Sequence, residues 1–133
     1  MSLGSGLHAE EIEFLVSRLV LDVRWLGVLA RDELFHYTRE IRPWCLILNT
    51  YPKDQPGSQL LALYAFSADS IELFDSFGCS PRTYSLDFLD SLHFPFSLQR
   101  PSTSVCGHYC IVYIYLRSHN YSLSDIVDML TDI

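Results

Sequence analysis

The sequence has little positive charge and no hydrophobic run long enough to cross a membrane. Only 9 of its 133 residues are lysine or arginine, against 16 aspartates and glutamates, which gives a net charge of −7. Because non-specific binding to nucleic acid needs several cationic contacts to phosphates, we expect no nucleic-acid partner. The longest apolar run, Leu60–Phe66, has only the length of a strand, so we expect no membrane contact either.

We expect no secretory signal, because no basic segment precedes the short apolar stretch Leu3–Leu7. The four cysteines are therefore expected to stay reduced inside a cell, in the cytoplasm or the nucleus. We expect residues 1–9 to form a flexible N-terminus or a vector-derived segment. Residues 10–133 are expected to form one domain, because a chain of this length suits one hydrophobic core.

Hydrophobic residues are plentiful, at 49% of the chain, which favours a packed core over disorder. Their spacing predicts an α+β domain with helices packed against a small mixed sheet that is mostly antiparallel. The expected elements are a helix over Glu10–Val20, a short apolar segment at Trp25–Leu29, a strand at Trp44–Leu48, a hairpin of Leu60–Phe66 and Ile71–Phe74, a short helix over Ser85–Leu92, a helix over Val105–Leu116 and a last helix capped by Ser122.

The same spacing predicts which sides of the helices are buried. Val105–Leu116 is apolar nearly all round, which is typical of a central buried helix. The first and last helices are amphipathic, with one apolar face each. These predicted inner faces consist of Ile12, Leu15, Val16 and Leu19 in the first helix and of Ile126, Met129 and Leu130 in the last.

Cys106 stands at the predicted start of the central helix, after a segment rich in proline and serine. A helix N-terminus stabilises negative charge, so a thiol at this position has a lowered pKa. From the residues alone, Cys106 is either such a reactive thiol or a small buried hydrophobe. Cys106 and Cys110 are one helical turn apart, but no second His/Cys pair completes a four-ligand zinc site. We therefore expect no metal and no cofactor.

The segment around this cysteine, LQRPSTSVCGHYC, resembles the nucleophile segment of the adenovirus protease (adenain) family and of the related SUMO and ubiquitin-like-modifier proteases. In both, a glutamine precedes a Cys-Gly pair, and here Gln99 stands seven residues before Cys106. Further family-like pieces occur upstream in the family's order. They are Trp25-Leu-Gly27, Cys45–Thr50 and Glu72–Gly78.

The resemblance implies a papain-like cysteine protease fold with a set of catalytic positions. Cys106 would be the nucleophile, and the amide of Gln99 would help to form the oxyanion hole. Asp75 would orient the catalytic histidine, although it also reads as a turn residue that hydrogen-bonds the following backbone.

The chain departs from the family at the histidine itself. The family's Gly-x-His-Trp corresponds to Gly57-Ser-Gln-Leu60 here, so Gln59 occupies the histidine position. No histidine lies between His36 and His93, so a shift of register does not help. An imidazole takes the thiol proton and later protonates the leaving amine, and a glutamine amide can do neither. We therefore expect a pseudoprotease that serves as a protein-binding or assembly module, with a protein or peptide partner.

Two alternatives remain open. One is an active thiol protease, virus- or transposon-derived, that cleaves peptide or ubiquitin-like substrates with a displaced base such as His93. The other is a structural domain that forms homo-oligomers, with an interface marked by exposed apolar residues among Trp25, Trp44 and Tyr113.

Overall fold

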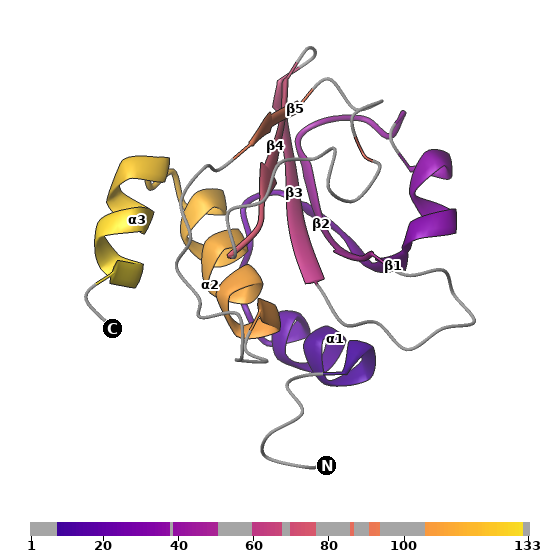
Figure 1. Cartoon of the computed structure of the whole chain (residues 1–133), viewed down its shortest axis with the longest axis horizontal. Helices are drawn as coiled ribbons and strands as arrows, with labels where there is room; N and C mark the ends of the chain where they lie inside the picture. The colour runs from indigo at the N-terminus through magenta and orange to yellow at the C-terminus, as the bar shows by residue number, and fades with distance from the viewer. Residues whose placement is uncertain are drawn as a thin grey trace.

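A mixed sheet lies at the centre of the computed structural model, with helices on both of its faces (Figure 1). The model describes residues 8–37, 39–50, 60–67, 70–76, 86, 91–93 and 106–131. Within these residues the sheet has five strands, which lie side by side in chain order. The strands are β1 (Arg24–Ala30), β2 (Trp44–Asn49), β3 (Leu60–Ser67), β4 (Ser70–Phe74) and β5 (Ser91–His93).

The three inner strands form an antiparallel meander, and each outer strand is parallel to its neighbour. β2 pairs with β3 and β3 with β4 in antiparallel register, whereas β1 joins β2 and β5 joins β4 in parallel. The predicted α+β class with a mixed sheet is thus confirmed, as is the predicted hairpin of β3 and β4. Arg42 Nη1 donates to the backbone oxygens of Ser67 and Ser70, at 2.7 and 3.0 Å, and so links the end of β3 to the start of β4.

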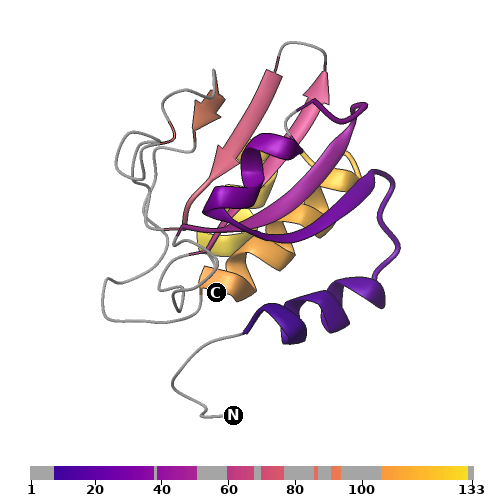
Figure 2. The same cartoon turned by 90° about the vertical axis from the view of Figure 1, so that its right-hand side faces the viewer.

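The helices are divided between the two faces of the sheet. They are α1 (Ala9–Ser17), the 3-10 helix η1 (Arg31–His36), α2 (Cys106–Ser118) and α3 (Leu123–Thr131). The side view shows η1 in front of the strands and α2 and α3 behind them (Figure 2). The predicted cap of α3 is confirmed, because the Asp125 backbone N–H donates to Ser122 Oγ at 3.1 Å.

Both faces of the inner strands are covered, which explains their continuous apolar sequences. On β2, Cys45 and Ile47 pack in the hydrophobic cluster that contains α1, α2 and α3. The alternate residues Trp44, Leu46 and Leu48 pack in the cluster on the opposite face, where η1 contributes Leu34. All five of these β2 side chains are fully buried. The core therefore consists of two apolar layers, one on each side of the sheet.

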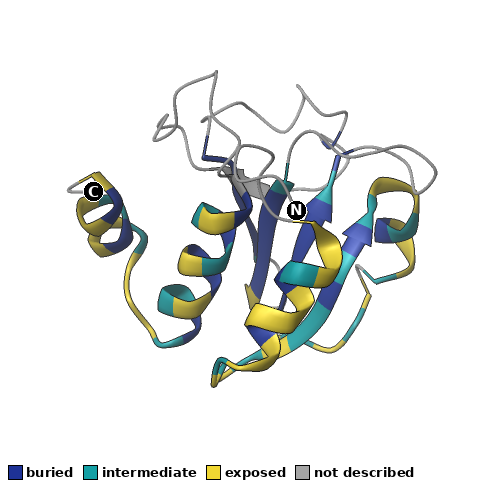
Figure 3. Cartoon of the chain, turned by 90° about the horizontal axis from the view of Figure 1, so that it is seen from below, coloured by how far each residue is buried: buried dark blue, intermediate teal, exposed yellow. Residues whose placement is uncertain are grey.

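Parts of the predicted burial are wrong. Leu15 and Met129, expected on inner faces, are each 41% exposed. Val112 and Tyr115 are also exposed, so α2 is buried on one side only (Figure 3). The side of α2 that packs against the sheet carries Cys110, Tyr113 and Ile114. An apolar composition all round a helix therefore did not mean burial all round.

The prediction of a short helix over Ser85–Leu92 is also wrong for its last two residues. Ser91–His93 form β5, which is hydrogen-bonded to β4 in parallel register. Pairing with a neighbouring strand gives the backbone of these residues its hydrogen bonds, and this outweighs a weak local capping signal. Of the rest of the predicted helix, the structure describes only Leu86. Its side chain is buried in the hydrophobic cluster that contains Leu34 of η1, called the η1-side cluster below.

Burial of the Cys45 thiol has a consequence for stability at alkaline pH. Burial raises the pKa of this thiol to about 12, whereas an unfolded cysteine ionises near 8.5. Because the pKa is higher in the folded state, the protonated thiol favours folding. Its contribution to the free energy of unfolding is complete below about pH 8.5 and is lost as pH rises toward 12. The loss from one such group approaches about 1.4 kcal/mol per pH unit.

We expect Cys45→Ala to flatten the fall in the free energy of unfolding above pH 8.5, as measured by urea denaturation at several pH values. Val16→Ala is the control, because it also truncates a buried side chain but removes no titrating group. It should lower stability by a similar amount at every pH. Equal slopes for Cys45→Ala and the wild type between pH 8.5 and 10, before unfolded tyrosines ionise, would contradict the assignment.

Candidate functional site

The first turn of α2 lies at the end of the sheet where β3 begins. The described part of α2 begins at Cys106, within the helix predicted over Val105–Leu116. One turn later, Cys110 Sγ donates to the backbone oxygen of Leu60, the first residue of β3, at 3.4 Å. Near the other end of α2, the Arg117 guanidinium lies over the rings of Tyr64 and Phe66, toward the far end of β3. α2 and β3 therefore run in the same direction.

The end of β4 reaches the same end of the sheet. β3 and β4 are antiparallel with Ala62 opposite Phe74, so the start of β3 lies beside the residues that follow Phe74. The first of these is Asp75, which is fully buried. The backbone thus brings together the start of α2, the start of β3 and the end of β4. Gln59 directly precedes this first residue of β3.

The predicted site residues are described to different extents. For Asp75 the structure describes the side chain, and for Cys106 it describes the helical backbone. Gln59 and Gln99 lie outside the described residues. The structure thus brings together the chain positions of Asp75 and Cys106, and the roles of all four residues stay predictions.

The histidines of the described part are spread over several elements. His108 is exposed on α2, and His36 is exposed on η1. His119 lies at the far end of α2, with Nε2 2.6 Å from the Val20 backbone oxygen and Nδ1 3.4 Å from Asp22 Oδ2. The backbone of His93, the displaced base considered above, ends β5 in register with Leu73. Leu73 belongs to the η1-side cluster, on the face opposite α2.

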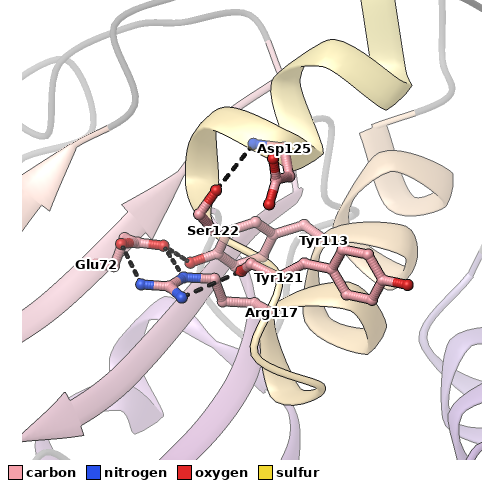
Figure 4. A network of polar contacts seen from close by, with 6 residues as sticks. All are labelled: Glu72, Tyr113, Arg117, Tyr121, Ser122 and Asp125. Atoms are coloured by element: carbon pink, nitrogen blue, oxygen red, sulfur yellow. Dashed lines mark hydrogen bonds and ion pairs between the residues drawn. The ribbon is translucent and has the colours of Figure 1, made fainter.

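A buried polar network that the sequence analysis missed joins α2 to β4 (Figure 4). Glu72 Oε1 accepts hydrogen bonds from the Tyr113 hydroxyl at 2.5 Å and from Arg117 Nε at 3.0 Å. Arg117 Nη2 donates to the second carboxylate oxygen, Oε2, at 3.3 Å, so the guanidinium and the carboxylate form a bidentate ion pair. This network fixes α2 along the sheet, and so it fixes the position at which the helix starts.

Burial and the neighbouring Glu72 shift the pKa values of Tyr113 and Arg117. Burial, and then the charge and hydrogen bond of Glu72, raise the pKa of Tyr113 well above its usual value, so this phenol stays protonated. Partial burial lowers the pKa of Arg117, but the hydrogen bond and charge of Glu72 outweigh it, and the net pKa is raised. A single glutamate in an apolar strand and a single arginine in an apolar helix were the only sequence signals for this pair.

A small apolar pocket lies beside the first turns of α2. It has a volume of about 140 Å³ and is lined by His108, Tyr109, Val112 and Leu130, which come from α2 and α3. Among the described residues there is no group of three or more His, Cys, Asp or Glu side chains that could hold a metal ion. In that same part of the chain, no helix has both the length and the apolar character to span a membrane.

Two of the three residues considered for an oligomer interface are buried. Trp44 and Tyr113 are fully buried, in opposite faces of the core. Trp25 is half-buried, and its indole N–H donates to Glu13 Oε1 at 3.0 Å. The two buried residues therefore serve the core of this chain rather than a surface.

Comparison with known proteins supports the class of fold. No protein-family model matches the chain, and no curated protein matches it. A solved structure is similar, namely the central domain of the uncharacterized Lpg1148 protein from Legionella pneumophila. The two share 14% sequence identity with a TM-score of 0.58, over 97% of this chain and 88% of the other. At this identity the similarity concerns the α+β fold alone.

Proposed function

We propose that this chain is a catalytically impaired cysteine protease domain of the papain-like, adenain type, which binds a segment of a protein partner. One observation carries the proposal. The start of α2 at Cys106, the end of β4 before Asp75 and the start of β3 after Gln59 meet at one end of the sheet. These are the positions at which the family resemblance puts the nucleophile, the orienting acid and the histidine, so their convergence supports it.

The chemistry at these positions favours binding over turnover. A cysteine with an ordinary pKa is a few per cent thiolate at pH 7, and the dipole of α2 adds only about 0.3–1 kcal/mol of stabilisation. Cys106 can therefore react with an alkylating reagent without a base. Amide cleavage also needs an acid for the leaving amine, and Gln59 supplies none. General acid–base catalysis is worth about 10²–10⁴-fold, so its loss leaves very little hydrolysis.

The pocket between α2 and α3 supports the binding half of the proposal. It is an open surface pocket of about 140 Å³ with an apolar described lining. This lining suits an aliphatic or phenyl side chain of a bound segment. The pocket begins two residues beyond Cys106, so a segment that passes the start of α2 can place such a side chain there.

We expect the wild-type chain to be alkylated at Cys106 and to hydrolyse neither fluorogenic peptides nor ubiquitin-like substrates. Iodoacetamide under native conditions, followed by peptide mass mapping, should label Cys106 before the buried Cys45 and Cys110. Hydrolysis should not exceed that of Cys106→Ala. Turnover that disappears in Cys106→Ala would overturn the proposal, as would labelling of Cys106 no faster than that of Cys45.

The active-enzyme alternative has its own test. It rests on His93, whose backbone is in register with Leu73, two residues before Asp75. If wild-type turnover is found, His93→Ala should abolish it while Cys106 remains open to alkylation. Turnover that survives in His93→Ala would exclude His93 as the base.

A further inference from the structure

The outer side of α1 presents apolar residues to solvent, although the helix itself is firmly attached. Ile12 and Val16 hold α1 in the core, and Glu13 Oε1 accepts the indole N–H of Trp25 at 3.0 Å. These contacts fix the rotation of the helix about its axis. The side turned outward carries Phe14 and Leu15, which are 56% and 41% exposed.

These two side chains lie in a hollow with an acidic edge. Glu10, Glu11, Phe14 and Leu15 line an open depression of about 310 Å³ on this side of the helix. Glu11 Oε1 accepts the His8 backbone N–H at 3.0 Å, but a carboxylate offers about four acceptor positions, so most of its capacity remains. The hollow therefore combines apolar surface with negative charge.

The ring of Phe14 already contacts a cation of this chain. The Arg18 guanidinium carbon lies 4.2 Å from the ring centroid, on the face of the ring. The negative face of an aromatic ring attracts cations, and guanidinium groups most often fill this role. Glu10 and Glu11, one turn earlier on α1, attract a cation from another molecule by the charge of their carboxylates.

We propose that this α1 surface, defined by Glu10, Glu11, Phe14 and Leu15, binds a segment of a partner protein in which a basic residue stands beside an apolar one. The basic side chain would pair with the carboxylates, and the apolar one would cover Phe14 and Leu15. A second copy of this chain is a poor occupant, because two molecules with a net charge of −7 repel each other. The proposal does not depend on Cys106 or on any catalysis.

The test measures fluorescence anisotropy of a labelled peptide that contains two Arg-Leu pairs spaced by glycine and serine. We expect saturable binding to the wild type that weakens with salt, because the contact is partly electrostatic. Phe14→Ala and Glu10→Lys should each weaken binding about five- to tenfold, since one removes a central aromatic contact and the other reverses a charge. A peptide with Glu in place of Arg should not bind.

Two control variants separate this surface from general effects. Phe35→Ala removes another exposed phenylalanine, on η1, and Asp128→Lys makes the same change in net charge on α3. Both should bind the Arg-Leu peptide within about twofold of the wild type, as should Cys106→Ala. Circular dichroism melts check that each variant is folded. No binding by the wild type, or equal weakening in control and α1 variants, would overturn the proposal.

Discussion

Histidine in place of Gln59 is expected to turn the chain into a slow hydrolase, with a rate about 10²–10⁴-fold above the wild type on fluorogenic peptide substrates. Residue 59 directly precedes Leu60, whose backbone oxygen accepts the Cys110 thiol one turn after Cys106. As proposed above, residue 59 occupies the histidine position of the family, so an imidazole there would serve as the base for Cys106. It would take the thiol proton and return it to the leaving amine.

The controls for this gain of activity are built from the same site. The double variant Gln59→His/Cys106→Ala should show no hydrolysis, because the imidazole then has no nucleophile to activate. Asp75→Asn in the Gln59→His background should reduce the rate, since a neutral side chain holds the imidazolium less well. If the single and double histidine variants hydrolyse equally, the assignment of residue 59 to the histidine position is wrong.

The second large effect concerns stability. Arg117→Met should lower the free energy of unfolding by about 3 kcal/mol or more, because it leaves the Glu72 carboxylate buried without its cation. The Glu72 side chain is only 6% exposed and that of Arg117 is 21% exposed, so water replaces little of the lost interaction. Urea denaturation at neutral pH measures the change. Tyr113 keeps its hydrogen bond to Glu72 in this variant, so we expect the loss of stability to stay close to this lower limit.

An exposed ion pair of the same length provides the control. Arg24 Nη1 lies 3.0 Å from Glu40 Oε2, with side chains 56% and 34% exposed. Arg24→Met should therefore cost less than about 1 kcal/mol. The double variant Glu72→Met/Arg117→Met should be more stable than Arg117→Met alone, since it removes both charges. Equal losses of stability in Arg117→Met and Arg24→Met would show that the buried pair contributes no more than the exposed one.

The sequence predicted those elements whose local pattern agrees with their final environment. The run at Trp44–Leu48 is apolar throughout because both faces of β2 are covered, and Leu60–Phe66 with Ile71–Phe74 made a recognisable hairpin. β5 was missed because its backbone pairs with β4, and no local signal encodes that pairing. The exposure of Leu15 was missed because spacing alone does not show how wide a covered face is.

Those features of the candidate site that depend on where helices and strands begin and end were predictable from the sequence. The helix that carries Cys106 and the strand that ends directly before Asp75 followed from residue spacing, and both elements are observed. The pair of Glu72 and Arg117 was not predictable, because its members are 45 residues apart and each is a lone charge in an apolar segment. Gln59 and Gln99 lie outside the described residues, so their roles stay predictions.

The two-layered core of this sheet has an evolutionary consequence. The side chains that hold the meander together lie along the inner strands, between the helices on one face and η1 on the other. The candidate site, in contrast, is assembled from the ends of three elements. A substitution such as the one proposed at residue 59, before the first residue of β3, therefore leaves these core side chains in place. Descendants of an enzyme with this architecture can drift toward a new use while natural selection continues to preserve the fold.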